Sequence, residues 1–160
     1  MNKIKLVAAA IIATAFGVTA LGQIIQVEYP SDYRSWQHIK TMVIEPGHPL
    51  EVPFGGIHHI YANSKAMKGL ETGDYKAGAV FVFDLLSYEN INQTIIEGER
   101  KRIDVMEYDA ERFSNTGGWA YETFIGSSKT ERLPQDVVTA CHGCHMGAKA
   151  SNYVFSQYRP

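Results

Sequence analysis

The sequence predicts an α+β fold in which flanking helices pack on a mostly antiparallel β-sheet. Three observations lead to this prediction: a run of β-branched and aromatic residues in the middle of the chain, further strand-like segments around it, and helix-start signals near both ends. The chain has 160 residues and shows no internal repeat or linker. That length is enough for one domain with a core of its own.

The composition excludes several classes of protein. Hydrophobic residues make up 45% of the chain and charged residues 20%, which is the balance of a globular domain. Fifteen Lys and Arg residues stand against seventeen Asp and Glu residues, a formal charge of −2. There is no basic excess to hold a phosphate backbone, so we expect no nucleic-acid partner. Two cysteines are too few for a disulfide-rich scaffold.

The first residues have the pattern of an export signal. Two lysines precede the uncharged run Leu6–Leu21, and small residues stand at Ala20 and Gly22. We therefore expect a signal peptide over 1–22, cleaved before Gln23, and a single periplasmic domain over 23–160. The alternative is an uncleaved anchor, for which a run of 16 residues is short.

The N-terminal half predicts two helices and two strands. Ser31 is a good helix N-cap. Tyr33, Trp36 and Ile39 follow at helical spacing and predict a helix that runs through Lys40. The other expected elements are strands over 41–45 and 56–62, and a short helix over 64–70 capped by Asn63 or Ser64.

The C-terminal half predicts the rest of the sheet and a last helix. Ala79–Leu86 is the segment richest in β-branched and aromatic residues, and therefore the clearest strand. A turn at 117–118 precedes a strand over Trp119–Ile125, and a helix that begins near Pro134 runs into the cysteines. Two more strands are expected over 93–99 and 102–108, with the basic run 100–102 as a solvated turn between them.

One motif carries chemistry. Residues 141–145 read Cys-His-Gly-Cys-His, the C-x-x-C-H sequence of c-type haem attachment. The thiols of Cys141 and Cys144 can each add across one haem vinyl group. This addition forms a thioether and releases no leaving group. His145 then supplies the proximal imidazole nitrogen to the iron. The sequence therefore predicts one covalently attached haem c.

Three other interpretations of the cysteine pair remain open. A disulfide between Cys141 and Cys144 would leave His145 unexplained. A dithiol redox motif normally opens a helix after a strand, whereas this motif lies close to the chain end. A zinc site would need a second pair of ligands, which only His58 and His59 offer.

The position of the motif argues for an iron with one vacant face. Met146 is adjacent to His145 and cannot reach the opposite side of the haem. Met42, Met67 and Met106 are more typical of core residues that fill gaps. We therefore expect a five-coordinate iron, which suits the binding of a small ligand or catalysis.

Six segments of the chain resemble one family of haem proteins. They are Tyr33–Trp36, Tyr61–Asn63, Gly73–Val80, Gly117–Tyr121, Cys141–His145 and Tyr153–Tyr158. The family is that of cytochrome P460, which includes the cytochromes c′-beta. The resemblance covers nearly all of the mature chain, and it implies a largely antiparallel sheet packed against one haem c in a homodimer.

The family divides by one residue. Its hydroxylamine-oxidising members carry a lysine on the long strand that is covalently linked to the haem macrocycle. The matching position is Phe83, and no lysine lies between Lys76 and Lys101. Lys76 is the nearest substitute. The sequence therefore resembles the cytochrome c′-beta type more closely.

In that type a pair of phenylalanines caps the distal face of the haem. The matching positions are Phe54 and Phe83, and Phe81 shares the face of Phe83 by strand parity. His58 is a further candidate for the distal pocket, ahead of its neighbour His59. The alternative is that all of these are ordinary core aromatics and strand histidines.

The resemblance implies a function in gas binding. Bound O₂ takes on superoxide-like charge and is helped by a hydrogen-bond donor, whereas NO and CO bind ferrous haem without one, so an apolar cap favours NO and CO. We expect NO scavenging, sensing or transport with an unknown redox partner. One alternative is a P460-type enzyme that oxidises hydroxylamine or NO, although an apolar pocket offers no general base for it. The other is an electron carrier.

For the haem propionates the candidates are Arg34, Arg159 and the run 100–102.

Overall fold

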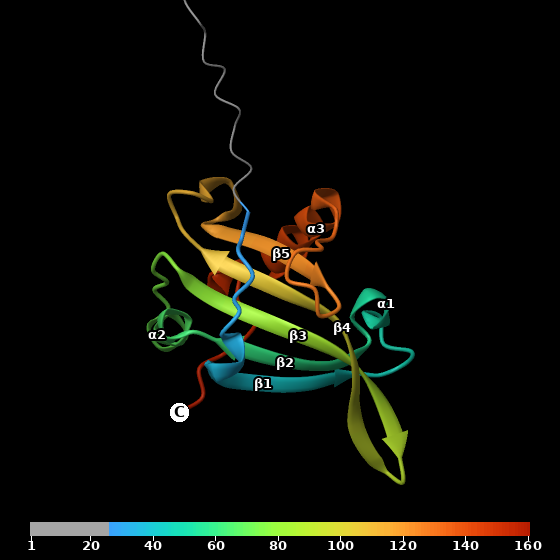
Figure 1. The fold of residues 1–160 in the computed structure, drawn as a ribbon. Coiled ribbons are helices and arrows are strands. Elements are labelled where there is room, and N and C mark those ends of the chain that lie inside the picture. Colours follow the sequence, from blue (N-terminus) through green and yellow to red (C-terminus); the bar gives the residue numbers. More distant parts are fainter. Residues whose placement is uncertain (1–25) are drawn as a thin grey trace, which may run out of the picture.

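The computed structural model describes residues 26–160, which form a five-stranded sheet with helices packed around it (Figure 1). Each strand pairs antiparallel with the next along the chain. This confirms the α+β class and the antiparallel sheet. The expected signal peptide over 1–22 lies outside the described residues. The strands are β1 (Gln37–Ile44), β2 (Gly56–Ala62), β3 (Ala79–Ile91), β4 (Thr94–Tyr108) and β5 (Trp119–Ile125), and the α-helices are α1 (Glu51–Phe54), α2 (Ser64–Thr72) and α3 (Gln135–His145).

The helix expected from Ser31 to Lys40 is wrong. The structure has only a 3₁₀ turn over Tyr33–Ser35, after which β1 begins at Gln37. Within this turn the Trp36 indole Nε1 donates to Asp32 Oδ2 at 3.1 Å, so the four-residue spacing serves a local side-chain contact instead of a helix. From Gln37 onward the chain pairs with β2, and the β-branched residues of this segment fit a strand better than a helix.

The two short strands expected at 93–99 and 102–108 are one continuous strand, β4. The turn lies earlier, at Asn92 and Gln93, whose φ angles of 52° and 63° are those of a tight hairpin. The basic run 100–102 is therefore inside the sheet. Arg100 stays in the strand because its guanidinium pairs with Asp84 on β3, at 2.6 Å from Nε to Oδ1.

Most of the remaining elements follow the sequence prediction, although β3 runs past its expected end at Leu86 to Ile91 and α1 was not predicted. Strands β2 and β5 have the expected bounds. Helix α2 begins after Asn63, whose side chain accepts a hydrogen bond from the Ala66 amide, and it ends at Gly73 in the left-handed conformation. Helix α3 begins after Pro134 and ends at His145, so it carries the whole motif.

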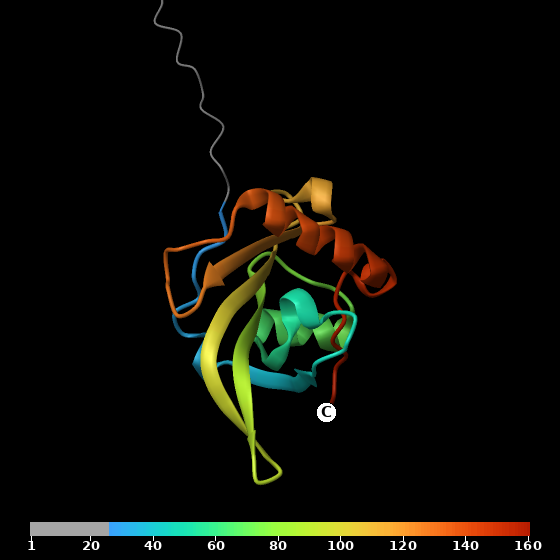
Figure 2. The same cartoon turned by 90° about the vertical axis from the view of Figure 1, so that its right-hand side faces the viewer.

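The two faces of the sheet are covered by different parts of the chain. Residues 26–36 cross one face, which we call the N-terminal face (Figure 1). Helix α3, the C-terminal segment and α1 lie on the other side (Figure 2), which we call the cavity face. The core of the N-terminal face includes Val27, Tyr33, Val82, Ile103, Val105 and Phe124. The core of the cavity face includes Ala66, Tyr75, Phe81, Met106, Trp119 and Val154.

A buried ionic cluster fixes the N-terminal segment on its face. Asp84 is fully buried and accepts hydrogen bonds from the Tyr33 hydroxyl at 2.7 Å and from Arg100 Nε at 2.6 Å. Arg34 adds a third contact at 3.2 Å. A buried carboxylate is tolerated only when it is paired in this way, so the cluster anchors residues 33–34 to the middle of the sheet.

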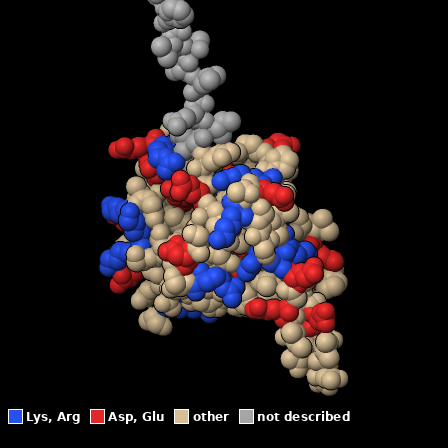
Figure 3. Space-filling view, in the orientation of Figure 1, with Lys and Arg blue, Asp and Glu red and all other residues tan. Residues whose placement is uncertain are grey.

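The exposed surface carries both signs of charge. Figure 3 shows lysine and arginine interspersed with aspartate and glutamate on the N-terminal face, and a projecting β3–β4 hairpin with an uncharged tip. At that tip Ile91, Ile95 and Ile96 are exposed. Within residues 26–160 no helix has the length and apolar character needed to cross a membrane.

The ionic cluster makes a testable contribution to stability. Tyr33→Phe removes the hydroxyl that bonds Asp84, and we expect a loss of about 1.5 kcal/mol in the free energy of unfolding because the acceptor is a buried charged group. Urea denaturation of the purified protein measures it. The control is Tyr29→Phe, since Tyr29 packs edge-on against Tyr33 at 6.4 Å and its hydroxyl bonds none of the described residues. Equal losses in the two variants would contradict the role of the cluster.

Candidate functional site

A cavity of about 390 Å³ lies between the cavity face of the sheet and helix α3. Its volume is in the range of pockets that hold organic ligands. The walls come from β1 to β5, α1, α3 and the segment after it, and they are mainly apolar. The lining residues are Lys40, Met42, Leu50, Phe54, Ile60, Phe81, Phe83, Asp104, Val105, Met106, Tyr121, Glu122, Cys141, Cys144, His145, Val154, Phe155 and Ser156.

Strand register explains which side chains of the sheet reach this cavity. Phe83 on β3 is paired with Ile60 on β2 and with Asp104 on β4. Directly paired residues place their side chains on the same face. The same relation joins Phe81 to Met106, and Met106 to Tyr121 on β5. The sheet therefore contributes one continuous wall.

Helix α3 brings the thiols and the imidazole of the motif to the cavity. Cys141, Cys144 and His145 are three and four residues apart, which puts them on one side of a helix, and all three line the cavity. Cys141 is half-buried and Cys144 is exposed, and both are free thiols. Burial raises the pKa of the Cys141 thiol to about 11.

The second imidazole nitrogen of His145 is held by the backbone. Its Nδ1 lies 2.6 Å from the carbonyl oxygen of Tyr153. A carbonyl can only accept, so Nδ1 carries the proton and donates it, and Nε2 is left with a free lone pair. The ring packs against Tyr121 at 5.0 Å and Phe155 at 5.2 Å. Burial lowers the pKa of His145, partly opposed by this hydrogen bond, which favours the neutral form that binds a metal.

The phenylalanines singled out from the sequence meet on the cavity wall. The rings of Phe54 and Phe83 contact each other edge to face, with centroids 6.2 Å apart. Phe54 belongs to α1, which lies between β1 and β2, whereas Phe83 belongs to β3. Phe81 lines the same cavity and is buried in the aromatic core with Tyr75 and Trp119. All three candidates are therefore brought together.

The histidines of β2 do not line the cavity. His58 is fully buried behind Phe83, with ring centroids 4.4 Å apart, and its Nε2 bonds the carbonyl of Phe54 at 2.5 Å. Burial lowers its pKa. His59 points to the opposite face, as strand parity predicts, where it bonds Thr41 and Glu97.

The cavity also has polar lining residues that the sequence analysis missed, among them one lysine and one aspartate. Lys40 reaches it from β1, and Asp104 reaches it from β4. Burial raises the pKa of Asp104, and the nearby Arg102 opposes this effect. The sequence predicted a pocket that offers no general base. For the cavity as a whole this prediction is wrong, because a carboxylate forms part of the wall. The signal that would have found it is the pairing of Asp104 with Phe83, which requires the cross-strand register.

None of the basic residues considered for haem propionates is among the residues that line the cavity, whereas Lys40 is. Arg34 and Arg100 are on the N-terminal face and bind Asp84. Lys76 is exposed and pairs with Asp74 at 2.7 Å, and it does not line the cavity. Among the lining residues just named, Lys40 is the one that carries a positive charge.

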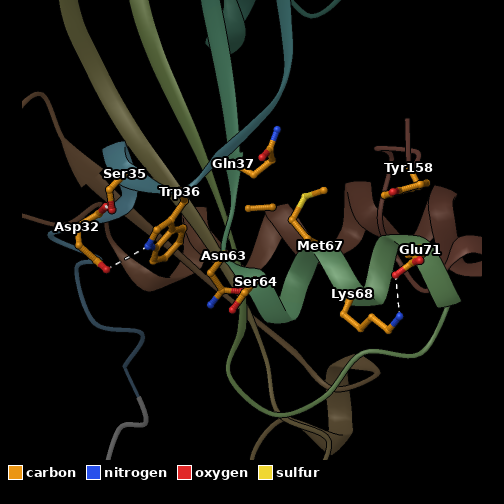
Figure 4. Close-up of a pocket in the computed structure, with 11 residues that line it drawn as sticks. Asp32, Ser35, Trp36, Gln37, Asn63, Ser64, Met67, Lys68, Glu71 and Tyr158 are labelled. Carbon is orange, nitrogen blue, oxygen red and sulfur yellow. Dashed lines mark hydrogen bonds and ion pairs between the residues drawn. The ribbon is translucent and has the colours of Figure 1, made fainter. Parts of the chain in front are cut away.

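A second, more open hollow lies beside α2 and has different chemistry. It measures about 790 Å³ and is lined by polar and aromatic side chains from the 3₁₀ turn, α2 and Tyr158. Figure 4 shows Trp36 bonded to Asp32 and Lys68 paired with Glu71 at its walls. Its lining includes no cysteine or histidine, so it does not compete with the first cavity as a haem site.

The residues of the first cavity fit a c-type haem better than a zinc ion. Two free thiols, an imidazole with an unoccupied Nε2 and apolar walls are the groups that such a haem requires. A zinc site needs four ligands. In the part of the chain that the structure describes, no three cysteine, histidine or acidic side chains gather closely enough to hold a metal ion.

The chain matches the profile of a known protein family. The profile of the family described as Cytochrome P460 matches residues 30–156, a range that includes every residue of the cavity. No curated protein sequence matches the chain.

The buried His58 makes stability depend on pH. Its pKa is lowered in the folded protein, so below about pH 6.5 the unfolded chain takes up a proton that the folded protein does not. We therefore expect the free energy of unfolding to fall between about pH 7.5 and about pH 5.5, and His58→Gln to flatten this slope. The control is His48→Gln, at an exposed position. An unchanged slope in His58→Gln would contradict this assignment.

We expect the two thiols to differ in reactivity in the haem-free protein. In haem-free protein at about pH 8, iodoacetamide should alkylate Cys144 several times faster than Cys141, because the thiolate is the nucleophile and burial keeps Cys141 protonated. Peptide mass spectrometry over time gives both rates. Equal rates would show that the Cys141 thiol is not buried as described.

Proposed function

The chain belongs to the cytochrome P460 family and its cofactor is a haem; from this we propose that it is an exported monohaem c-type cytochrome that binds NO or CO in a capped cavity. The proposal includes the closer likeness to the cytochrome c′-beta type, since Phe83 stands where a cross-linking lysine is expected in the catalytic members. The edge-to-face pair of Phe54 and Phe83, on the wall of the same cavity as His145, is the observation that carries it.

The residues that would hold the haem are Cys141 and Cys144 through thioethers and His145 through Nε2. The hydrogen bond from Nδ1 to Tyr153 orients the imidazole and increases its basicity. Lys40 is the lining residue whose charge suits a propionate carboxylate. When bound, the haem supplies a ferrous iron that coordinates diatomic gases.

The three phenylalanines of the cavity wall favour ligands that need no hydrogen bond. Phe54, Phe83 and Phe81 offer no hydrogen-bond donor, and a donor would stabilise bound O₂. The Asp104 carboxylate offers no donor either, since its oxygens accept from Arg102 at 3.0 Å and from Thr123 at 2.6 Å. NO and CO need neither donor nor acceptor. The expected roles are NO scavenging, sensing or transport.

The surroundings of the protein are part of the same proposal. The signal-like sequence before Gln23 supports export to the periplasm, and the family resemblance supports a homodimer. A redox partner that reduces the iron is also implied, because NO and CO bind the ferrous state.

A P460-type enzyme is the second candidate, and two cavity residues favour it. Lys40 offers an amine at the wall in place of the strand lysine that this sequence lacks, and Asp104 offers a carboxylate that can take protons from hydroxylamine. This candidate predicts a third covalent link between the chain and the haem, through Lys40. An electron carrier would instead use Met42 or Met106, both of which line the cavity, as a sixth ligand.

Optical spectra of the purified holoprotein separate the three candidates. We expect a high-spin ferrous spectrum that changes on addition of NO or CO, with little response to azide. A haem-peptide digest should show links at Cys141 and Cys144 and none at Lys40. A red-shifted ferrous spectrum with a Lys40 link would support the enzyme instead. A low-spin spectrum that ignores NO and CO, and becomes high-spin in Met42→Leu or Met106→Leu, would support the electron carrier.

A further inference from the structure

The cap over the cavity depends on the placement of a short segment. Phe54 ends α1, a helix of 4 residues in the connection between β1 and β2. Residues 45–53 are exposed, so few core contacts hold this connection. The Phe54 ring reaches Phe83 only if α1 is kept against the sheet.

Three side chains hold the end of α1 in place. His58 bonds the carbonyl of Phe54 at 2.5 Å, and Lys101 Nζ donates to the carbonyl of Gly55 at 2.6 Å. The guanidinium of Arg102 lies over the Phe54 ring, 4.6 Å from its centroid. Arg102 is the one that touches the ring itself, and such a stacked contact is attractive.

Arg102 is in turn fixed by the cavity wall. Its Nε donates to Asp104 Oδ2 at 3.0 Å, and the other oxygen of Asp104 accepts from Thr123 at 2.6 Å. The side chains of Arg102 and Asp104 are only 14% and 20% exposed. Swinging Arg102 away would leave a largely buried carboxylate without its charged partner, which is costly.

From this geometry we propose that Arg102, fixed by Asp104 and assisted by Lys101, is a positioning residue that holds Phe54 closed over the haem cavity and so sets how easily ligands enter. The inference rests on the proposed function, because it presumes an iron that takes a ligand in this cavity. We call Arg102, Asp104 and Lys101 together the latch, a charged contact that lies outside the apolar cap. Small ligands pass when the latch opens transiently, and bulky ligands are excluded while it is closed.

The test measures entry into the ferrous and ferric holoprotein. We expect Arg102→Gln to raise the association rate of CO about fivefold, as the loss of one partly buried cation–π contact implies. It should also let imidazole, a bulky neutral ligand, bind the ferric iron, whereas we expect the unchanged protein to exclude imidazole. Phe54→Ala removes the ring itself, so it should also raise the CO association rate and allow imidazole to bind.

The double variant distinguishes a latch from a general disturbance. If Arg102 acts through Phe54, adding Arg102→Gln to Phe54→Ala should change the CO rate by less than about twofold. The matched control is Arg112→Gln. Arg112 also stacks on a phenylalanine, Phe113 at 4.8 Å, and pairs with an acid, Glu107 at 3.2 Å, but neither of these partners lines the cavity. This control should leave both ligands unaffected.

The results of these variants distinguish failure of the inference from failure of the proposed function. Wild-type rates in Arg102→Gln, or the same acceleration with and without Phe54, would overturn the inference while leaving gas binding intact. If Arg102→Gln does not fold with haem attached, the exposed Lys101→Met replaces it and should raise the CO rate in the same direction; no rise would overturn the inference. Failure of the unchanged protein to bind CO at all would instead count against the proposed function.

Discussion

The alternation of side chains along β3 is the constraint on which the rest of the structure depends. Asp84 points to the N-terminal face, where it is fully buried and bonded to Tyr33 and Arg100. Its neighbour Phe83 points the other way, into the cavity. A register slip of one residue would put a carboxylate on the cavity wall and a phenylalanine among the arginines. The ionic cluster on one face thereby fixes the cap on the other.

The proximal and distal sides of the proposed haem site are built by separate parts of the chain. The proximal side comes from α3 and the segment that follows it, joined by the hydrogen bond between His145 and Tyr153. The distal side comes from α1, β3 and β4, joined by the contacts of Arg102. Because the two sets share few residues, the proposed function implies that ligand entry and iron ligation are separable by mutation.

Local sequence signals predicted much of this fold. The β-branched run of β3, the glycine turn before β5, the Asn63 cap of α2 and the start of α3 near Pro134 are all decided by nearby residues. The motif at 141–145 is equally local, since its spacing carries the chemistry. These features were predictable because no distant contact is needed to form them.

Features that depend on distant contacts were not predictable in this way. The spacing of Tyr33, Trp36 and Ile39 is that of a helix, but pairing with β2 makes residues 37–40 part of a strand. Arg100 belongs to a basic run that is typical of a turn, yet its bond to Asp84 keeps it in the sheet. Lys40 and Asp104 reach the cavity through cross-strand register, which parity within a single strand does not reveal.

Electron paramagnetic resonance of the ferric holoprotein tests the central claim most directly. An iron bound by His145 on one side and left open beneath phenylalanine rings on the other should give a high-spin signal. That signal should become low-spin only when a strong exogenous ligand is forced into the cavity. A low-spin signal from the protein alone would mean that a side chain of this chain already occupies the sixth position, and the account of an open, capped iron would be wrong.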